Sequence, residues 1–213
     1  MRIGISWSGG KDSCLAAIIA QQMGHTPMVL LNMMNENGKI SRSHALPHAI
    51  LQQQAKSCGL PLHTVATSWA DYEAKFVQQL VTLKNEYQLE GMVFGDIDLQ
   101  PHRDWEEMVC AKAGLTAILP LWKWPRNQVI AMVWEQKIHT HIVSCNTQMG
   151  ENFLGEQLTP ALVKILQEKG IDACGENGEY HTVVTHCSLF QQAIPIQFGK
   201  KYTHQQYCFI ETN

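Results

Sequence analysis

The chain is short of charge, and the charge that it carries is nearly balanced. Aspartate, glutamate, lysine and arginine make up 16% of the 213 residues, and the formal net charge is −3. No cluster of lysine and arginine is present, which argues against tight binding to a nucleic-acid backbone. The longest apolar run is far too short to span a bilayer, so we expect no membrane role. With 45% hydrophobic residues, the chain is expected to be globular with little disorder.

Paired cysteines are also missing. Seven cysteines are scattered through the chain, and none belongs to a C-x-x-C pair. The chain opens on a strand-like run rather than on a signal peptide, so we expect a reducing, cytoplasmic compartment. No internal repeat or low-complexity tract is present.

The strongest motif is Ser8-Gly9-Gly10-Lys11-Asp12-Ser13, which stands between an apolar run at 3–7 and a helical stretch at 14–20. A buried strand that turns through glycines into a helix N-terminus directs several backbone N–H groups at one spot, which predicts a phosphate site. The Walker pattern is absent, because Ile5 and Asp12 stand where it requires Gly and Ser or Thr. The alternative is an ordinary turn with Ser13 or Asp12 as the helix N-cap.

Each residue type in this loop has an expected task. The glycines let the backbone approach an anion, and the serines can donate hydroxyl hydrogen bonds. Lys11 would offset the charge that develops on a leaving pyrophosphate. Because Asp12 would be repelled by a polyphosphate unless a cation intervenes, we infer Mg²⁺ with Asp12 as a ligand.

Strand-like and helical patterns alternate from Met1 to about Trp124. Strands are expected at 2–7, 26–33, 60–67, 91–97 and 116–122, with an amphipathic helix at 70–87. This alternation predicts an α/β fold with a doubly wound, parallel, five-stranded sheet. Beyond Trp124 we expect helices at 126–137 and 160–168 and β-rich segments at 180–190, 194–198 and 206–211. We therefore predict a nucleotide-binding domain over 1–124 and a smaller α+β domain over 125–213, with the active site at their junction.

Carboxylates are expected at the ligand-binding edge of this sheet. Ligands bind outside the carboxyl ends of the strands, where the strand order reverses. The run at 91–95 would deliver Asp96 and Asp98 to the edge that carries the phosphate loop. They could bind metal or orient a substrate, or they could only cap the helix that begins near His102. The polar segment 34–44 is expected to be a mobile loop over the site.

A second motif, Cys174-Gly175-Glu176-Asn177-Gly178-Glu179-Tyr180-His181-Thr182, is typical of a tight turn on composition alone. The loop at 8–13 resembles the pyrophosphate loop of the adenine nucleotide alpha hydrolases, and with the second motif the chain resembles the diphthine ammonia ligase family. Residues between and after the two motifs are also similar: Gly95-Asp96-Ile97, Arg103, Glu106, Cys110, Gly114-Leu115, Pro120-Leu121-Trp122, Arg126, Gln128, Leu154-Gly155, Leu158, Cys187 and Leu189-Phe190.

The resemblance implies a HUP-like fold and an ATP-dependent amidation in which a carboxylate is adenylated and ammonia then displaces AMP. It implies a set of residues that bind ATP and metal: Ser8, Gly9, Gly10, Lys11, Asp12, Ser13 and Asp96. It implies a second set around the acceptor, Gly175, Glu176, Gly178, Glu179 and Thr182, and we expect Asp98, Arg103 and His181 to bind the substrate as well. Lys11, Asp12, Glu176 and Glu179 are expected to be catalytic, and Glu176 or Glu179 would bind ammonium or remove its proton.

Two positions depart from the family's signature, since Asn177 replaces a glycine and His181 an acidic residue. These departures concern the acceptor, so a small-molecule carboxylate, for example a corrinoid-related one, stands beside protein diphthine. Two other classes stay open: an ATP or AMP sensor with little turnover, and a tRNA-modifying adenylase, which the low charge and the missing C-x-x-C disfavour. The expected partners are ATP, free ammonium and the acceptor, and a homodimer is left open.

Overall fold

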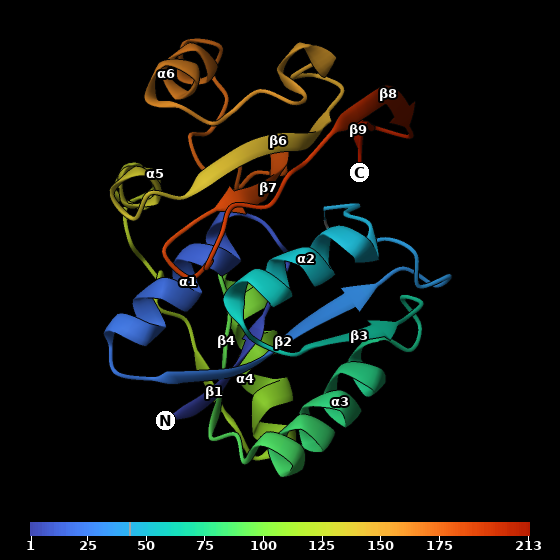
Figure 1. Cartoon of the computed structure of the whole chain (residues 1–213), viewed down its shortest axis with the longest axis vertical. Coiled ribbons are helices and arrows are strands. Elements are labelled where there is room, and N and C mark those ends of the chain that lie inside the picture. The colour runs from blue at the N-terminus through green and yellow to red at the C-terminus, as the bar shows by residue number, and fades with distance from the viewer. Residues whose placement is uncertain (43) are drawn as a thin grey trace.

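The computed structural model describes residues 1–42 and 44–213. Its first unit is built on a parallel sheet of five strands in the order β3-β2-β1-β4-β5 (Figure 1). The strands are β1 (Arg2–Ser6), β2 (Thr26–Met34), β3 (Leu62–Ala66), β4 (Gly91–Val93) and β5 (Thr116–Ile118). The predicted doubly wound, parallel α/β sheet is thus confirmed.

Helices cover both faces of this sheet, because alternate strand residues point to opposite sides. Ile3 and Ile5 of β1 pack in one apolar cluster with α1 (Lys11–Gln22) and α2 (His48–Cys58). Val29 and Leu31 of β2 pack in another with α3 (Tyr72–Tyr87) and α4 (Gln100–Ala113).

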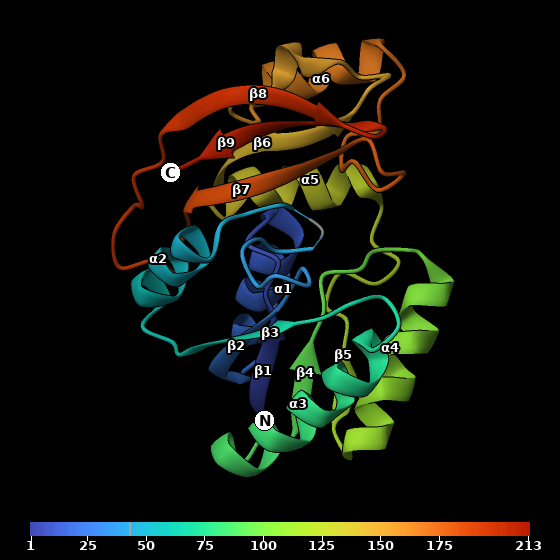
Figure 2. The same ribbon diagram turned by 90° about the vertical axis from the view of Figure 1, so that its right-hand side faces the viewer.

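The second unit is an antiparallel sheet in the order β7-β6-β9-β8 with two helices. Its elements are α5 (Arg126–Glu135), β6 (His139–Asn146), a 3-10 turn η1 (Glu151–Phe153), α6 (Pro160–Glu168), β7 (Tyr180–His186), β8 (Phe198–His204) and β9 (Tyr207–Thr212). The sheet lies between α6 on its outer side and the first unit (Figure 2). One cluster of buried apolar side chains continues from α1 and α2 into this sheet, and the division at residue 124 stays a prediction.

Four predicted strands differ from the observed ones, and one of them is the segment expected at 180–190, which ends at His186. The strand expected at 194–198 is wrong, because β8 begins at Phe198 and runs to His204. The alternating apolar residues there reflect burial of Ile194 against the end of β7, where its N–H donates to the Thr185 carbonyl at 2.9 Å. The runs 91–97 and 116–122 shorten to 91–93 and 116–118, since the residues that follow each run are packed as loops.

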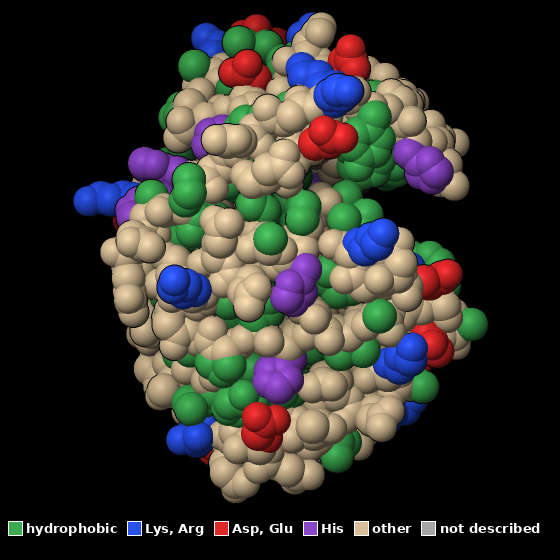
Figure 3. All heavy atoms as spheres, turned by 45° about the vertical axis from the view of Figure 1, so that its right-hand side comes forward, with side chains coloured by type: hydrophobic (Ala, Val, Ile, Leu, Met, Phe, Trp, Pro, Cys, Tyr) green, Lys and Arg blue, Asp and Glu red, His purple; other side chains and the backbone are tan. Residues whose placement is uncertain are grey.

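The surface agrees with the low charge of the sequence. In Figure 3, acidic and basic side chains are scattered over the face in view and form no extended basic surface there. Within residues 1–42 and 44–213, no helix combines the length and the apolar character that crossing a membrane requires.

Candidate functional site

The candidate site lies where the strand order reverses, at the carboxyl ends of the neighbouring parallel strands β1 and β4. β1 leads into the loop of residues 8–10, and β4 leads into the loop that carries Asp96. A Cβ on Gly95 would lie 2.8 Å from the backbone of Asp12 and of Ser13. Only glycine permits this approach, which brings the Asp96 loop against the start of α1.

The loop of residues 8–10 turns through a left-handed glycine into α1, as the sequence predicts for a phosphate site, and its binding of phosphate stays a prediction. Gly9 has a φ of +85°, in the left-handed region. The Ser8 hydroxyl lies 2.9 Å from the Ser13 hydroxyl and accepts from the Gly10 N–H at 3.3 Å. The N-cap of α1 is Gly10, without a side-chain cap, and both Asp12 and Ser13 lie inside the helix. The capping alternative for Asp12 and Ser13 is therefore wrong.

A buried glutamine, Gln54, holds the loop of residues 8–10 in place, and the sequence analysis did not identify it. Gln54 of α2 is fully buried. Its Oε1 accepts from the Trp7 indole N–H at 2.8 Å, and its Nε2 donates to the carbonyls of Gly9 at 3.0 Å and Val184 at 2.8 Å. The signal for it was a glutamine among the apolar residues of an amphipathic helix. Gln54 thus ties the phosphate loop to β7.

Lys11 connects the loop to the C-terminal motif. Its backbone N–H donates to the Thr182 hydroxyl at 3.1 Å. Its buried ammonium donates to an Asp12 carboxylate oxygen at 2.8 Å and to the Cys174 carbonyl. Burial alone would lower the pKa of Lys11, but the neighbouring acidic groups, Asp12 first among them, together outweigh it and the pKa is raised. The cation therefore stays charged, and its expected action on a leaving pyrophosphate stays a prediction.

Three carboxylates are close enough to perturb one another beside this loop. Burial, then the charges of Asp12 and Asp96, raise the pKa of Glu176 to about 8, although Lys11 opposes the shift. Burial also raises the pKa of Asp12, which Lys11 pulls down and Asp96 pushes up. Among the described residues, the buried Asp12 Oδ1 has no hydrogen-bond partner. Like charges close together in a poorly solvated site raise one another's pKa, and among the described residues no group of three or more His, Cys, Asp or Glu side chains is arranged to hold a metal ion.

Asp96 has its own supporting residues on α4. Its Oδ1 lies 2.7 Å from His102 Nδ1. Burial and the Asp96 charge raise the pKa of Glu106 to about 10, so this carboxyl is protonated at neutral pH and can donate to Asp96. Burial would raise the pKa of Asp96, but hydrogen bonds from His102 and Glu106 lower it. The α4 N-cap is Leu99, so neither Asp96 nor Asp98 occupies the cap position.

Two predicted acceptor residues contact other side chains instead of the three carboxylates. Both carboxylate oxygens of Asp98 accept from Arg126, at 2.9 and 3.0 Å. Arg103 donates to Glu107 at 2.6 Å and lies over the Trp122 ring at 5.0 Å.

The C-terminal motif forms a turn that Glu179 closes. Its oxygens accept from the backbone N–H of Asp172 at 3.2 Å and of Asn177 at 2.9 Å, and from the Asn177 amide at 3.0 Å. Gly175 and Gly178 have φ values of +72° and +81°. A Cβ on Gly175 would also lie 2.9 Å from the Tyr180 carbonyl, so this turn requires glycine there.

A histidine pair stands against the phosphate loop. The rings of His44 and His181 are 4.7 Å apart, and a Cβ on Gly10 would overlap His44 Nε2. Burial, then the charge of Lys11, lower the pKa of His181 to about 4, and burial and His181 lower that of His44. Both rings are therefore neutral at pH 7. The sequence analysis named the segment 34–44 but did not single out His44. Ser43, in this segment, lies outside the described residues, and the mobility of the segment stays a prediction.

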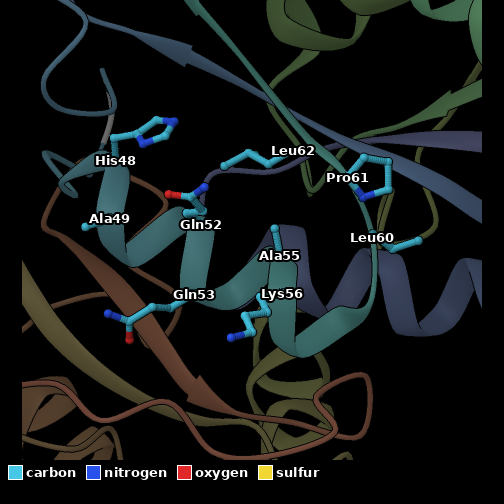
Figure 4. Close-up of a pocket in the computed structure, with 9 residues that line it drawn as sticks. All are labelled: His48, Ala49, Gln52, Gln53, Ala55, Lys56, Leu60, Pro61 and Leu62. Atoms are coloured by element: carbon cyan, nitrogen blue, oxygen red, sulfur yellow. The ribbon is translucent and has the colours of Figure 1, made fainter.

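A separate groove of about 600 Å³ lies between α2 and the start of β3 (Figure 4). Its polar side chains include His48, Gln52 and Lys56, and it has no carboxylate among its described lining residues. It therefore does not match the chemistry of the phosphate loop.

Comparison with known proteins covers both units. The family model described as diphthamide synthase N-terminal domain matches residues 1–117, and the one described as diphthamide synthase C-terminal domain matches residues 126–213. The chain is similar to the diphthine–ammonia ligase of Bos taurus, at 25% identity over 98% of this chain and 88% of that protein. It is also similar to that of Homo sapiens, at 23% identity over the same shares.

The chain is also similar to a longer relative and to a solved structure. The diphthine–ammonia ligase of Schizosaccharomyces pombe is 25% identical over 96% of this chain and only 38% of that longer protein. A solved structure titled as a predicted subunit of tRNA methyltransferase from Methanocaldococcus jannaschii aligns with a TM-score of 0.46 at 17% identity, over 88% of this chain and 98% of that one, a likeness too loose to support an argument. The two family models, matched in order over nearly the whole chain, show that the protein belongs to the diphthamide synthase family.

Proposed function

We propose that this protein is an ATP-dependent ligase that joins ammonia to a carboxylate and releases AMP and pyrophosphate. The names of its relatives, diphthine–ammonia ligases, support the reaction class. The observation that carries the proposal is the contact between the loop of residues 8–13 and the C-terminal motif, where the Lys11 N–H donates to the Thr182 hydroxyl and the Lys11 ammonium donates to Asp12 and to the Cys174 carbonyl. A loop suited to phosphate in contact with a turn that bears carboxylates is what a reaction between ATP and ammonium requires.

The phosphate loop would hold the β and γ phosphates. The first N–H groups of α1 have no partner within the helix. That of Lys11 donates to the Thr182 hydroxyl of β7, and the others would bind the phosphates. The Ser8 and Ser13 hydroxyls, which hydrogen-bond one another at 2.9 Å, would turn toward the phosphates and add donors. A carboxylate oxygen of the acceptor attacks the α phosphorus, the bond to the bridging oxygen breaks, and pyrophosphate leaves with that electron pair.

The residues present fit Mg²⁺. Asp12 has a buried carboxylate oxygen without a partner among the described residues, and Asp96 is ionised nearby. Mg²⁺ prefers oxygen ligands and needs only one or two carboxylates when phosphates supply the rest. Asp12 and Asp96 would hold it, and bound there it would neutralise charge on the phosphates.

We assign the ammonia step to Glu176. With a pKa of about 8, it can bind ammonium and accept a proton once it is ionised, as the pH passes through that value. Glu176 takes one proton from the bound ammonium, and the nitrogen of the resulting ammonia attacks the acyl carbon of the adenylate. The bond between that carbon and the AMP oxygen breaks, AMP leaves with the electron pair, and the second proton, which the new amide loses, passes to the AMP phosphate or to solvent. The Glu179 carboxylate accepts three hydrogen bonds within the turn, so it would hold the turn that positions Glu176.

The acceptor would lie along the C-terminal motif. Gly175, Gly178, Thr182 and His181 border the loop that carries Glu176, and Asp98 and Arg103 remain candidates on the α4 side. The names of the relatives favour diphthine as the acceptor. Asn177 and His181 depart from the signature on this side of the site, so a small carboxylic acid is the competing acceptor.

The test is product analysis with purified protein, Mg·ATP and ammonium, with diphthine-bearing elongation factor and with corrinoid acids. Acceptor-dependent AMP and pyrophosphate are the expected products. ADP and phosphate would contradict attack at the α phosphorus, and tight ATP binding without turnover on any acceptor would favour the sensor.

Two variants locate the steps. Lys11→Ala should abolish turnover and leave the fold intact. Glu176→Gln should retain acceptor-dependent pyrophosphate exchange while amide formation falls at least about 100-fold. Glu168→Gln, on the exposed face of α6, is the matched control and should behave as the wild type.

A further inference from the structure

Arg126 joins two loops that are far apart in the sequence. It is the first residue of α5. On one side its Nε and one terminal nitrogen hold both oxygens of Asp98, at 2.9 and 3.0 Å. On the other side its second terminal nitrogen donates to the Asn177 side-chain oxygen at 3.0 Å and lies 3.3 Å from Asp172. One guanidinium therefore bridges the loop after β4 and the C-terminal motif.

The link continues from Arg126 to the backbone of Glu176. The Asp172 carboxylate oxygen that faces Arg126 also accepts from the backbone N–H of Cys174 at 3.2 Å and of Glu176 at 3.0 Å. The Cys174 thiol in turn donates to the Arg126 carbonyl at 3.1 Å. Displacement of Arg126 would thus release the carboxylate that fixes the main chain at Glu176.

An isolated ion pair at a surface contributes little to stability. Arg126 differs, because its planar fork engages three side chains from two segments and is about one-quarter exposed. A lysine has one compact charge and cannot reproduce the paired bonds to Asp98 together with the contact to Asn177. We therefore expect these bonds of Arg126 to orient the segment 172–177 more than they raise the stability of the fold.

We propose that Arg126 is a positioning residue for the ammonia step: anchored on Asp98, it holds Asp172 and thereby sets the Glu176 carboxylate toward Asp12 and Asp96. This inference rests on the function proposed for Glu176. It gives Asp98 the task of an anchor for Arg126, in place of a direct contact with the acceptor.

Hydrogen exchange tests the anchoring without any turnover. In Arg126→Gln, backbone amides of residues 172–179 should exchange at least about tenfold faster, while those at the start of α1 keep the wild-type rate. In Arg126→Lys, the exchange rates over residues 172–179 should lie between those of the wild type and those of Arg126→Gln. Arg2→Gln is the matched control, because the exposed Arg2 side chain donates to the Tyr87 carbonyl at the far end of β1, away from residues 172–179. Unchanged exchange over 172–179 in Arg126→Gln would overturn the proposal.

Kinetics then test the consequence for the reaction. In Arg126→Gln, kcat for amide formation should fall about 10- to 100-fold, while the Kd for ATP stays within about twofold. Asp98→Asn should have a similar effect, and the double variant should add little, since both changes break one link. An unchanged kcat despite faster exchange would also overturn the proposal. If the wild type makes no amide, the proposed function fails, and the exchange result alone decides whether Arg126 holds the turn.

Discussion

Replacement of Gln54 by leucine should destabilise the protein and weaken ATP binding together. The change removes the acceptor of the buried Trp7 indole N–H and one donor to the Val184 carbonyl. The Gly9 carbonyl keeps its bond from the Val184 N–H at 2.9 Å. Each buried polar group left without a partner costs about 1–3 kcal/mol. The two groups together predict a loss of about 2–4 kcal/mol, after allowance for the apolar contact that leucine gains.

For a chain of this length, 1 kcal/mol shifts the Tm by about 2–4 °C, so the predicted fall is about 4–16 °C. Thermal unfolding followed by near-UV circular dichroism measures it, and titration calorimetry with an ATP analogue measures the affinity. Gln52→Leu, exposed on the same helix, is the control and should stay within about 0.5 kcal/mol of the wild type. A Tm loss in Gln54→Leu no larger than in this control would refute the reasoning.

Three further outcomes are expected. Gly10→Ala should raise the Kd for ATP at least about tenfold, because the new Cβ would overlap His44 Nε2; an unchanged Kd in calorimetry would contradict this. The pKa of Glu106 is raised from 4.5 to about 10, so the folded state keeps a proton that the unfolded chain releases, and stability falls as pH rises between these values. Glu106→Gln keeps a donor to Asp96 but has no proton to lose. Its free energy of unfolding in urea should gain at least about 1 kcal/mol over that of the wild type between about pH 6 and pH 9, and parallel curves of stability against pH for the two proteins would contradict this. Amide formation should rise as pH passes through about 8, where Glu176 ionises, and a pH–rate profile with the same limb in Glu176→Gln would assign that limb to another group.

The local patterns were sufficient for the fold, and they placed the loop of residues 8–13 at the end of β1, where its binding of phosphate stays a prediction. Alternating strands and helices predicted the parallel sheet, because burial on both faces needs continuous apolar runs with helices between them. The loop at 8–13 could be assigned from the sequence because its chemistry comes from consecutive residues. Asp96 could be placed near it because the carboxyl ends of parallel strands meet at one edge.

The tertiary structure alone decided how the two motifs meet. The bond from the Lys11 N–H to Thr182 joins residues 171 positions apart, and that from Gln54 to Val184 spans 130. Sequence spacing could not separate Glu176 from Glu179, because both lie in one short turn. The fold separates them, since backbone N–H groups hold the Glu179 carboxylate and burial beside Asp12 raises the pKa of Glu176. The sequence by itself determined which groups are present, and the packing of β7 against α1 determined which of them face one another, because contacts between distant segments have no period or spacing along the chain.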